Sequence, residues 1–145
     1  MRLITDVVTE SGVRFETGKP VRFPFIRNTV ASPRPSRHGH DQFQQKLEPA
    51  GAYLLHDTVR NKNLARGWVS GIATFRKPLV LPWSISDRYD DQSWKALVAR
   101  AFRARGKRLT QKLLAHGYDA IVTVDRHGGT SEIIALDPRT QLVFD

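Results

Sequence analysis

Residues 117–138 read GYDAIVTVDRHGGTSEIIALDP, which is two short apolar runs joined by a polar turn. The runs cover residues 120–124 and 133–136, and a pair of glycines lies in the segment between them. Such β-branched runs around a short glycine-containing loop predict a β-hairpin. The second run is apolar on both faces, so we expect it to lie inside a sheet. Glu132 leads this run, either as an edge charge or as a catalytic group.

Further strands and turns are expected upstream of the hairpin. Pro24 cannot donate a hydrogen bond to a ladder, so its strand is expected at a sheet edge or bulged. Gly51 indicates a turn or a close approach of the backbone. Residues 31–40 are expected to form a basic loop and residues 41–46 a helical turn. The expected strands cover residues 3–8, 13–17, 21–30, the stretch up to 55 that follows Gly51, 68–75 and 78–82.

Two helices are predicted between these strands and the hairpin. The first has one apolar face with Lys95, Arg100 and Arg103 opposite, and we expect Gly106 to end it. Its apolar face consists of Trp94, Leu97, Val98, Ala101 and Phe102. The second is expected over residues 108–116, with Leu109, Leu113 and Leu114 inward and Gly117 as its stop. A further segment, 59–68, is expected to be capped by residues 56–58.

These elements predict one α+β domain over residues 1–145, with two packed, mostly antiparallel sheets, flanking helices and a cleft between the sheets. The chain has no cysteine, which excludes disulfides, thiolate zinc sites and cysteine nucleophiles. His38 and His40 share a loop without further ligands, so no metal site is expected. No apolar run approaches the roughly 20 residues that span a bilayer, and we expect a soluble, cytoplasmic protein.

The charge is strongly positive, because 23 Lys and Arg stand against 14 Asp and Glu, giving +9. A surplus of this size favours a polyanionic partner such as RNA or DNA, since phosphate contacts release counterions. The alternative is that the charge serves solubility alone.

Three separated segments, taken together, resemble the mono-ADP-ribosyltransferase superfamily in the form found in bacterial toxins, effectors and phage proteins. The first is the strand end Arg27-Asn28-Thr29. The second is the stretch 48–53 (EPAGAY), followed by residues 64–68 (LARGW). The third is the hairpin with its glutamate-led strand. The segments occur in the family's order over residues 21–143, and the third is the most specific of them.

The resemblance implies cleavage of the nicotinamide glycosidic bond of NAD and transfer of ADP-ribose to a nucleophile. Glu132 would stabilise the oxocarbenium-like ribose. Arg27 would pair with the pyrophosphate or ribose, and the backbone at Asn28 would hold the carboxamide. Tyr53 would stack on the nicotinamide ring, and Thr29 and Gly51 complete the expected NAD site.

Two positions depart from the family's pattern. Members that modify arginine carry Glu or Gln two residues before the catalytic Glu, where this chain has Thr130, so arginine is not the expected acceptor. Asn28 stands where a small residue is usual, which affects the nicotinamide pose.

The acceptor is argued from charge. The basic surface slightly favours nucleic acid over a protein target, and Arg126, His127 and Thr130 would lie beside it. An inhibitory partner protein and delivery into a target cell are compatible with the family. Two alternatives are a basic nucleic-acid-binding module without catalysis and an NAD glycohydrolase that uses water. A glycosidase with paired carboxylates is disfavoured, because Asp119 and Asp125 have the pattern of turn residues.

Overall fold

The predicted hairpin is confirmed in the computed structural model, which describes residues 3–8, 14–29, 47–58, 64–86 and 93–145. Strand β7 (Ala120–Val124) pairs antiparallel with β8 (Thr130–Ala135). Strand β8 also pairs with β4 (Ala52–His56) on its other side, so it is an interior strand, as its apolar sequence predicted.

Nine strands in the described residues form one sheet, in the order β1-β2-β6-β7-β8-β4-β3-β5-β9. The pairings are antiparallel except for β6 with β7, which is parallel. The remaining strands are β1 (Leu3–Val8), β2 (Arg14–Gly18), β3 (Val21–Asn28), β5 (Trp68–Phe75), β6 (Pro78–Leu81) and β9 (Leu142–Phe144). The predicted strands are therefore present, and the mostly antiparallel pairing is confirmed.

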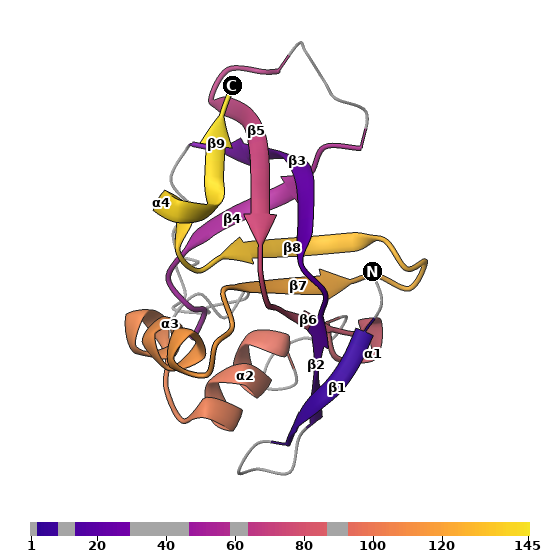
Figure 1. Cartoon of the computed structure of the whole chain (residues 1–145), viewed down its shortest axis with the longest axis vertical. Helices are drawn as coiled ribbons and strands as arrows, with labels where there is room; N and C mark the ends of the chain where they lie inside the picture. Colours follow the sequence, from indigo (N-terminus) through magenta and orange to yellow (C-terminus); the bar gives the residue numbers. More distant parts are fainter. Residues whose placement is uncertain (1–2, 9–13, 30–46, 59–63, 87–92) are drawn as a thin grey trace, which may run out of the picture.

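The sheet curls, so that β3, β5 and β9 run across the direction of β7 and β8 (Figure 1). Between these two groups of strands lies an inner core, which includes Phe23, Phe25, Leu54, Phe75, Val122 and Ile133. The other face of β6, β7 and β8 is covered by helices, and this helix-side core includes Leu79, Val98, Leu109, Leu113, Ile121 and Ile134. Neighbours Ile133 and Ile134 belong to different cores, because successive side chains of a strand point to opposite faces.

Pro24 is neither in a fully open edge strand nor at a bulge. β3 pairs with β5 in continuous register from Val21 to Asn28, and Pro24 is opposite Ile72. On the other side of β3, pairing with β4 covers Phe25 and Ile26, and the Pro24 carbonyl accepts a hydrogen bond from the Asp57 backbone N–H at 2.9 Å. Proline is tolerated because the β4 ladder ends here and needs no donor.

The helices are α1 (Trp83–Ser86), α2 (Trp94–Phe102), α3 (Gly106–Ala115) and α4 (Pro138–Gln141). The amphipathic α2 is confirmed, but Gly106 does not end it: Arg103 does so with a left-handed backbone (φ 54°), and Gly106 begins α3. Leu109 and Leu113 are buried in the helix-side core, whereas Leu114 is exposed, contrary to the prediction. Gly117 follows α3 with φ 90°, as expected of a helix stop.

Other expectations concern parts outside the described residues. The basic loop 31–40, the turn 41–46 and residues 59–63 of the predicted capped segment all lie there. The rest of that segment is a turn, after which Trp68 begins β5. Among the helices of the described part, none combines the length and apolar character that a membrane crossing requires.

Candidate functional site

Glu132 is fixed at a β-bulge in the centre of the sheet. Val122 pairs with Ile133 and Val124 pairs with Thr130, so two residues of β8 lie opposite Thr123 alone. The buried hydroxyl of Thr123 accepts a hydrogen bond from the Glu132 backbone N–H at 2.7 Å and donates one to the Glu132 carbonyl at 3.1 Å. Bulges of this kind re-aim a side chain and recur next to active sites.

The Glu132 side chain is half-buried and directed toward the helix side of the sheet. The indole Nε1 of Trp94, the first residue of α2, donates a hydrogen bond to its Oε2 at 3.2 Å. Ser93 caps the helix by accepting a hydrogen bond from the Ala96 N–H at 3.2 Å, which fixes the helix start that carries Trp94. Both the backbone and the carboxylate of Glu132 are therefore held in place.

Two further charged residues and a tyrosine complete an aromatic–carboxylate cluster, made of Glu48, Tyr53, Trp94, Lys95 and Glu132. Lys95 Nζ forms an ion pair with Glu48 Oε2 at 2.8 Å. The same ammonium lies 5.8 Å from the Tyr53 ring centroid and 5.7 Å from that of Trp94, within the range of cation–π attraction. Lys95 is buried, which corrects the prediction that it occupies the exposed face of α2.

The Tyr53 hydroxyl stays protonated to a higher pH than an ordinary tyrosine, because its pKa is raised. Burial raises the pKa of its hydroxyl, and the nearby carboxylates of Glu48 and Glu132 raise the pKa further. The hydroxyl donates a hydrogen bond to the Pro49 carbonyl at 3.1 Å. Tyr53 thus supplies an aromatic surface and a fixed dipole beside Glu132, and it cannot act as a base near neutral pH.

Chemically, the cluster can stabilise developing positive charge next to Glu132. A carboxylate fixed before the reaction begins needs no reorganisation when the charge forms. Glu48 is a second carboxylate near Tyr53 that sequence reasoning did not connect with Glu132. Glu48 is held in its ion pair with Lys95.

The residues at the end of β3 lie on a different part of the sheet from Glu132. Arg27 shares a face of β3 with Phe23 and Phe25, whose side chains enter the inner core, whereas Glu132 points toward the helices. Asn28 is exposed and opposite Trp68. The backbone N–H and hydroxyl of Thr29 both donate to the Gly67 carbonyl, at 2.6 and 2.7 Å, so Thr29 closes the turn before β5.

Gly51 has a packing role. A Cβ at this position would stand 2.5 Å from the carbonyl oxygen of Ala135 in β8. The predicted close approach of the backbone is confirmed, and the neighbour is a strand of the same sheet.

The turn between β7 and β8 is organised by Asp125. Its Oδ1 accepts hydrogen bonds from the backbone N–H groups of His127 and Gly129, at 2.8 and 3.0 Å. Arg126 and His127 are exposed at this hairpin tip. Asp119 is likewise a turn residue, because its carboxylate accepts from the backbone N–H groups of Arg76 and Lys77 at 2.7 and 2.9 Å.

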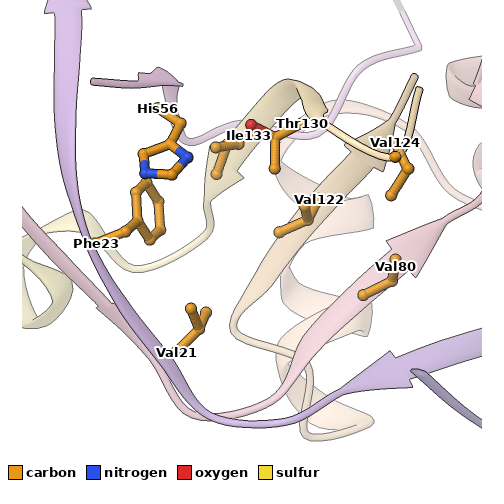
Figure 2. A pocket seen from close by; sticks show the side chains of 9 residues that line it. Val21, Phe23, His56, Val80, Val122, Val124, Thr130 and Ile133 are labelled. Carbon is orange, nitrogen blue, oxygen red and sulfur yellow. The ribbon is translucent and has the colours of Figure 1, made fainter. Parts of the chain in front are cut away.

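Thr130 lines a pocket of about 410 Å3 on the inner side of the sheet. Figure 2 shows the pocket wall of valines from β6 and β7, with Thr130, Ile133 and the edge-to-face pair Phe23 and His56 on other sides. The Phe23 and His56 ring centroids are 5.3 Å apart. Ile133 enters this pocket and Glu132 points the other way, so pocket and cluster lie on opposite faces of β8.

The sequence reading missed three residues that surround Glu132. Trp94 was identified only as a core residue, and Thr123 and Glu48 had no assigned role. Of the three, Trp94 reaches Glu132 from a segment far along the chain, for which the local sequence gives no signal. Thr123 meets Glu132 across the predicted hairpin, and Glu48 precedes Tyr53 within the stretch 48–53, but the sequence does not show that their side chains take part in the site.

Comparisons with known proteins do not assign a family: no protein-family model, no curated protein and no solved structure matches the chain.

Proposed function

We propose that the protein cleaves the nicotinamide glycosidic bond of NAD and transfers ADP-ribose to a macromolecular acceptor, with Glu132 as the catalytic carboxylate. The observation that carries this proposal is the position of Glu132. It lies half-buried at a bulge of an interior strand, with its backbone held by Thr123 and its carboxylate held by Trp94. A charged side chain restrained in this way is more typical of a functional group than of a solvated edge residue.

The neighbours of Glu132 fit the nicotinamide–ribose end of NAD. Tyr53 is half-buried and provides aromatic surface for a flat ring, and Glu132 provides an acceptor for a ribose hydroxyl. Trp94 is buried, and its part is to hold the Glu132 carboxylate. The resemblance of the hairpin and of the 48–53 stretch to mono-ADP-ribosyltransferases supports the same assignment. Arg27 lies on the inner-core face of β3, whereas Glu132 points toward the helices, so Arg27 has no role in the proposed reaction.

In the proposed reaction, the bond between ribose C1′ and the nicotinamide nitrogen breaks, and its electron pair leaves with nicotinamide. Positive charge develops on the ribose, and the Glu132 carboxylate stabilises it while accepting a hydrogen bond from the 2′-hydroxyl. A nucleophilic oxygen or nitrogen of the acceptor then forms a bond to C1′ and releases its proton to solvent. Products are nicotinamide and the ADP-ribosylated acceptor.

The proposal is tested by following the ADP-ribose half of NAD. The protein is incubated with NAD labelled in the adenine ring, with RNA, DNA or cell extract added separately. We expect label in one macromolecular pool, and none with Glu132→Gln. Label released only as free ADP-ribose would identify a glycohydrolase, and unchanged NAD in every mixture would refute the enzyme.

A further inference from the structure

In the segment that forms α2 and α3, every Asp, Glu, Lys or Arg position is a Lys or an Arg. Residues 93–118 contain seven Lys and Arg and no Asp or Glu: Lys95, Arg100, Arg103, Arg105, Lys107, Arg108 and Lys112. Figure 1 shows the two helices next to one another on one side of the sheet. This part of the surface therefore carries a concentrated share of the net charge of +9.

Lys95 and Lys112 contact other parts of the fold. Lys95 is buried in its ion pair with Glu48. Lys112 Nζ donates to the Phe102 carbonyl at 3.0 Å and reaches the Arg103 carbonyl at 3.5 Å, so it caps the end of α2. The other five are exposed.

Three of the exposed arginines surround a shallow hollow of about 350 Å3 where α2 turns into α3. Arg100 is in the last turn of α2, Arg103 is its left-handed cap, and Arg105 precedes α3. The other residues that line it are apolar, namely Leu47 and alanines that include Ala96 and Ala99. The lining of the hollow thus combines arginines with uncharged side chains.

We propose that this hollow binds single-stranded nucleic acid. Guanidinium groups pair with phosphate oxygens in two-point contacts and also stack on bases. The apolar part of the lining suits the face of an unpaired base, which a duplex keeps inside its stack. A peptide made of acidic residues alone would satisfy the arginines, but it would leave the apolar lining without a matching group.

The position of the hollow also points to its use. Helix α2 begins at Trp94, which contacts Glu132, and it ends at the hollow, about 12 Å further along at 1.5 Å per residue. A strand bound in the hollow can therefore bring a neighbouring nucleotide toward Glu132. This last step, in which the bound strand is the acceptor, rests on the proposed transferase activity; the binding itself does not.

Binding is tested without NAD, by fluorescence anisotropy with labelled single-stranded RNA and DNA of about 16 nucleotides, the upper range of sites on small binding domains. The test variant is Arg100→Gln/Arg103→Gln/Arg105→Gln. The control, Arg22→Gln/Arg76→Gln/Arg139→Gln, removes the same charge from exposed arginines of β3, the β5–β6 turn and α4. Matching melting curves show that both variants are folded.

We expect wild-type affinity to fall steeply with salt. If the three arginines each contact a phosphate, the test variant loses about 2 from the slope of log K against log salt, and its affinity falls on the order of 100-fold at ~0.1 M salt. The control stays within about threefold of wild type. Equal losses in both variants, equal affinity for duplex, or equally effective competition by poly-glutamate would overturn the proposal.

The same proteins separate this proposal from the proposed reaction. Glu132→Gln is expected to bind the oligonucleotide like wild type. Binding that is sensitive to the three arginines, in a protein that leaves NAD intact, would retain the nucleic-acid surface and refute the transferase. Cleavage of NAD by a protein that binds no oligonucleotide would refute the nucleic-acid surface and leave the NAD-cleaving activity in place.

Discussion

At the scale of single residues, Glu132 is defined by what holds it. Its backbone is bonded to Thr123 and its carboxylate to Trp94, and Tyr53 lies within its electrostatic influence. The residue type and its place before an apolar strand are visible in the sequence. The three neighbours come from β7, α2 and β4, and only the folded chain brings them together.

Tyr53 gives a prediction for alkaline pH. Because its folded-state pKa is raised above the ordinary value of 10.0, its contribution to stability is complete below about pH 10 and is lost as the pH rises further. We expect the free energy of unfolding of wild type to fall more steeply above pH ~10 than that of Tyr53→Phe.

Denaturant titrations at several pH values measure this difference. The near-ultraviolet tyrosinate signal of wild type minus Tyr53→Phe provides the control, and it is expected to be absent at pH ~10 while the protein is folded. A Tyr53 signal that appears with an ordinary midpoint would contradict the buried position beside two carboxylates.

At the scale of elements, the bulge in β7 and β8 is the feature that aims Glu132. Replacing Thr123 by Val removes the hydroxyl and leaves the Glu132 N–H without its acceptor, so we expect unfolding to become easier by about 1–3 kcal/mol. Nicotinamide release should fall at least tenfold. Thr123→Ser keeps the hydroxyl and should retain most activity. Equal activity of the Val and Ser variants would show that the bulge does not position Glu132.

A substitution at Gly51, the residue before β4, tests whether glycine is needed there for packing or for NAD binding. With Ala at this position, the new Cβ meets the Ala135 carbonyl, and we expect a loss of about 3 kcal/mol in unfolding free energy. Gly106→Ala is the control: it has open space but φ 58°, and should cost about 1 kcal/mol. A stable Gly51→Ala protein with a raised KM for NAD would instead support the cofactor role.

Most elements could be predicted from periodicity and turn residues, and the exceptions have physical causes. The short α4 and β9 come after Asp137, and both are too brief to show a period. The predicted end of α2 at Gly106 was wrong, because Arg103 and not a glycine adopts the left-handed backbone that ends the helix. The parallel pairing of β6 with β7 joins strands between which the described residues contain the three helices α1, α2 and α3, and no local pattern specifies it.

At the scale of the whole molecule, the curled sheet separates three environments. The inner pocket opens on one face of β8, the aromatic–carboxylate cluster lies on the other, and the basic hollow is at the far end of α2. The composition gives the excess of positive charge, and from it we predicted a polyanionic partner. It could not predict that Lys95 is buried against Glu48 while Arg100, Arg103 and Arg105 gather around one hollow, since that depends on how the loop before β4 packs on α2.

The most direct measurement is the rate of nicotinamide release from NAD by wild type, Glu132→Gln and Ser131→Ala. Gln can still accept the Trp94 hydrogen bond, so the fold should be kept, and Ser131 is the exposed neighbour that serves as control. We predict release by wild type and Ser131→Ala, and a rate lower by about 10²–10³ for Glu132→Gln at an unchanged melting temperature. No release by wild type, or an undiminished rate in Glu132→Gln, would contradict the assignment of Glu132 as the catalytic carboxylate.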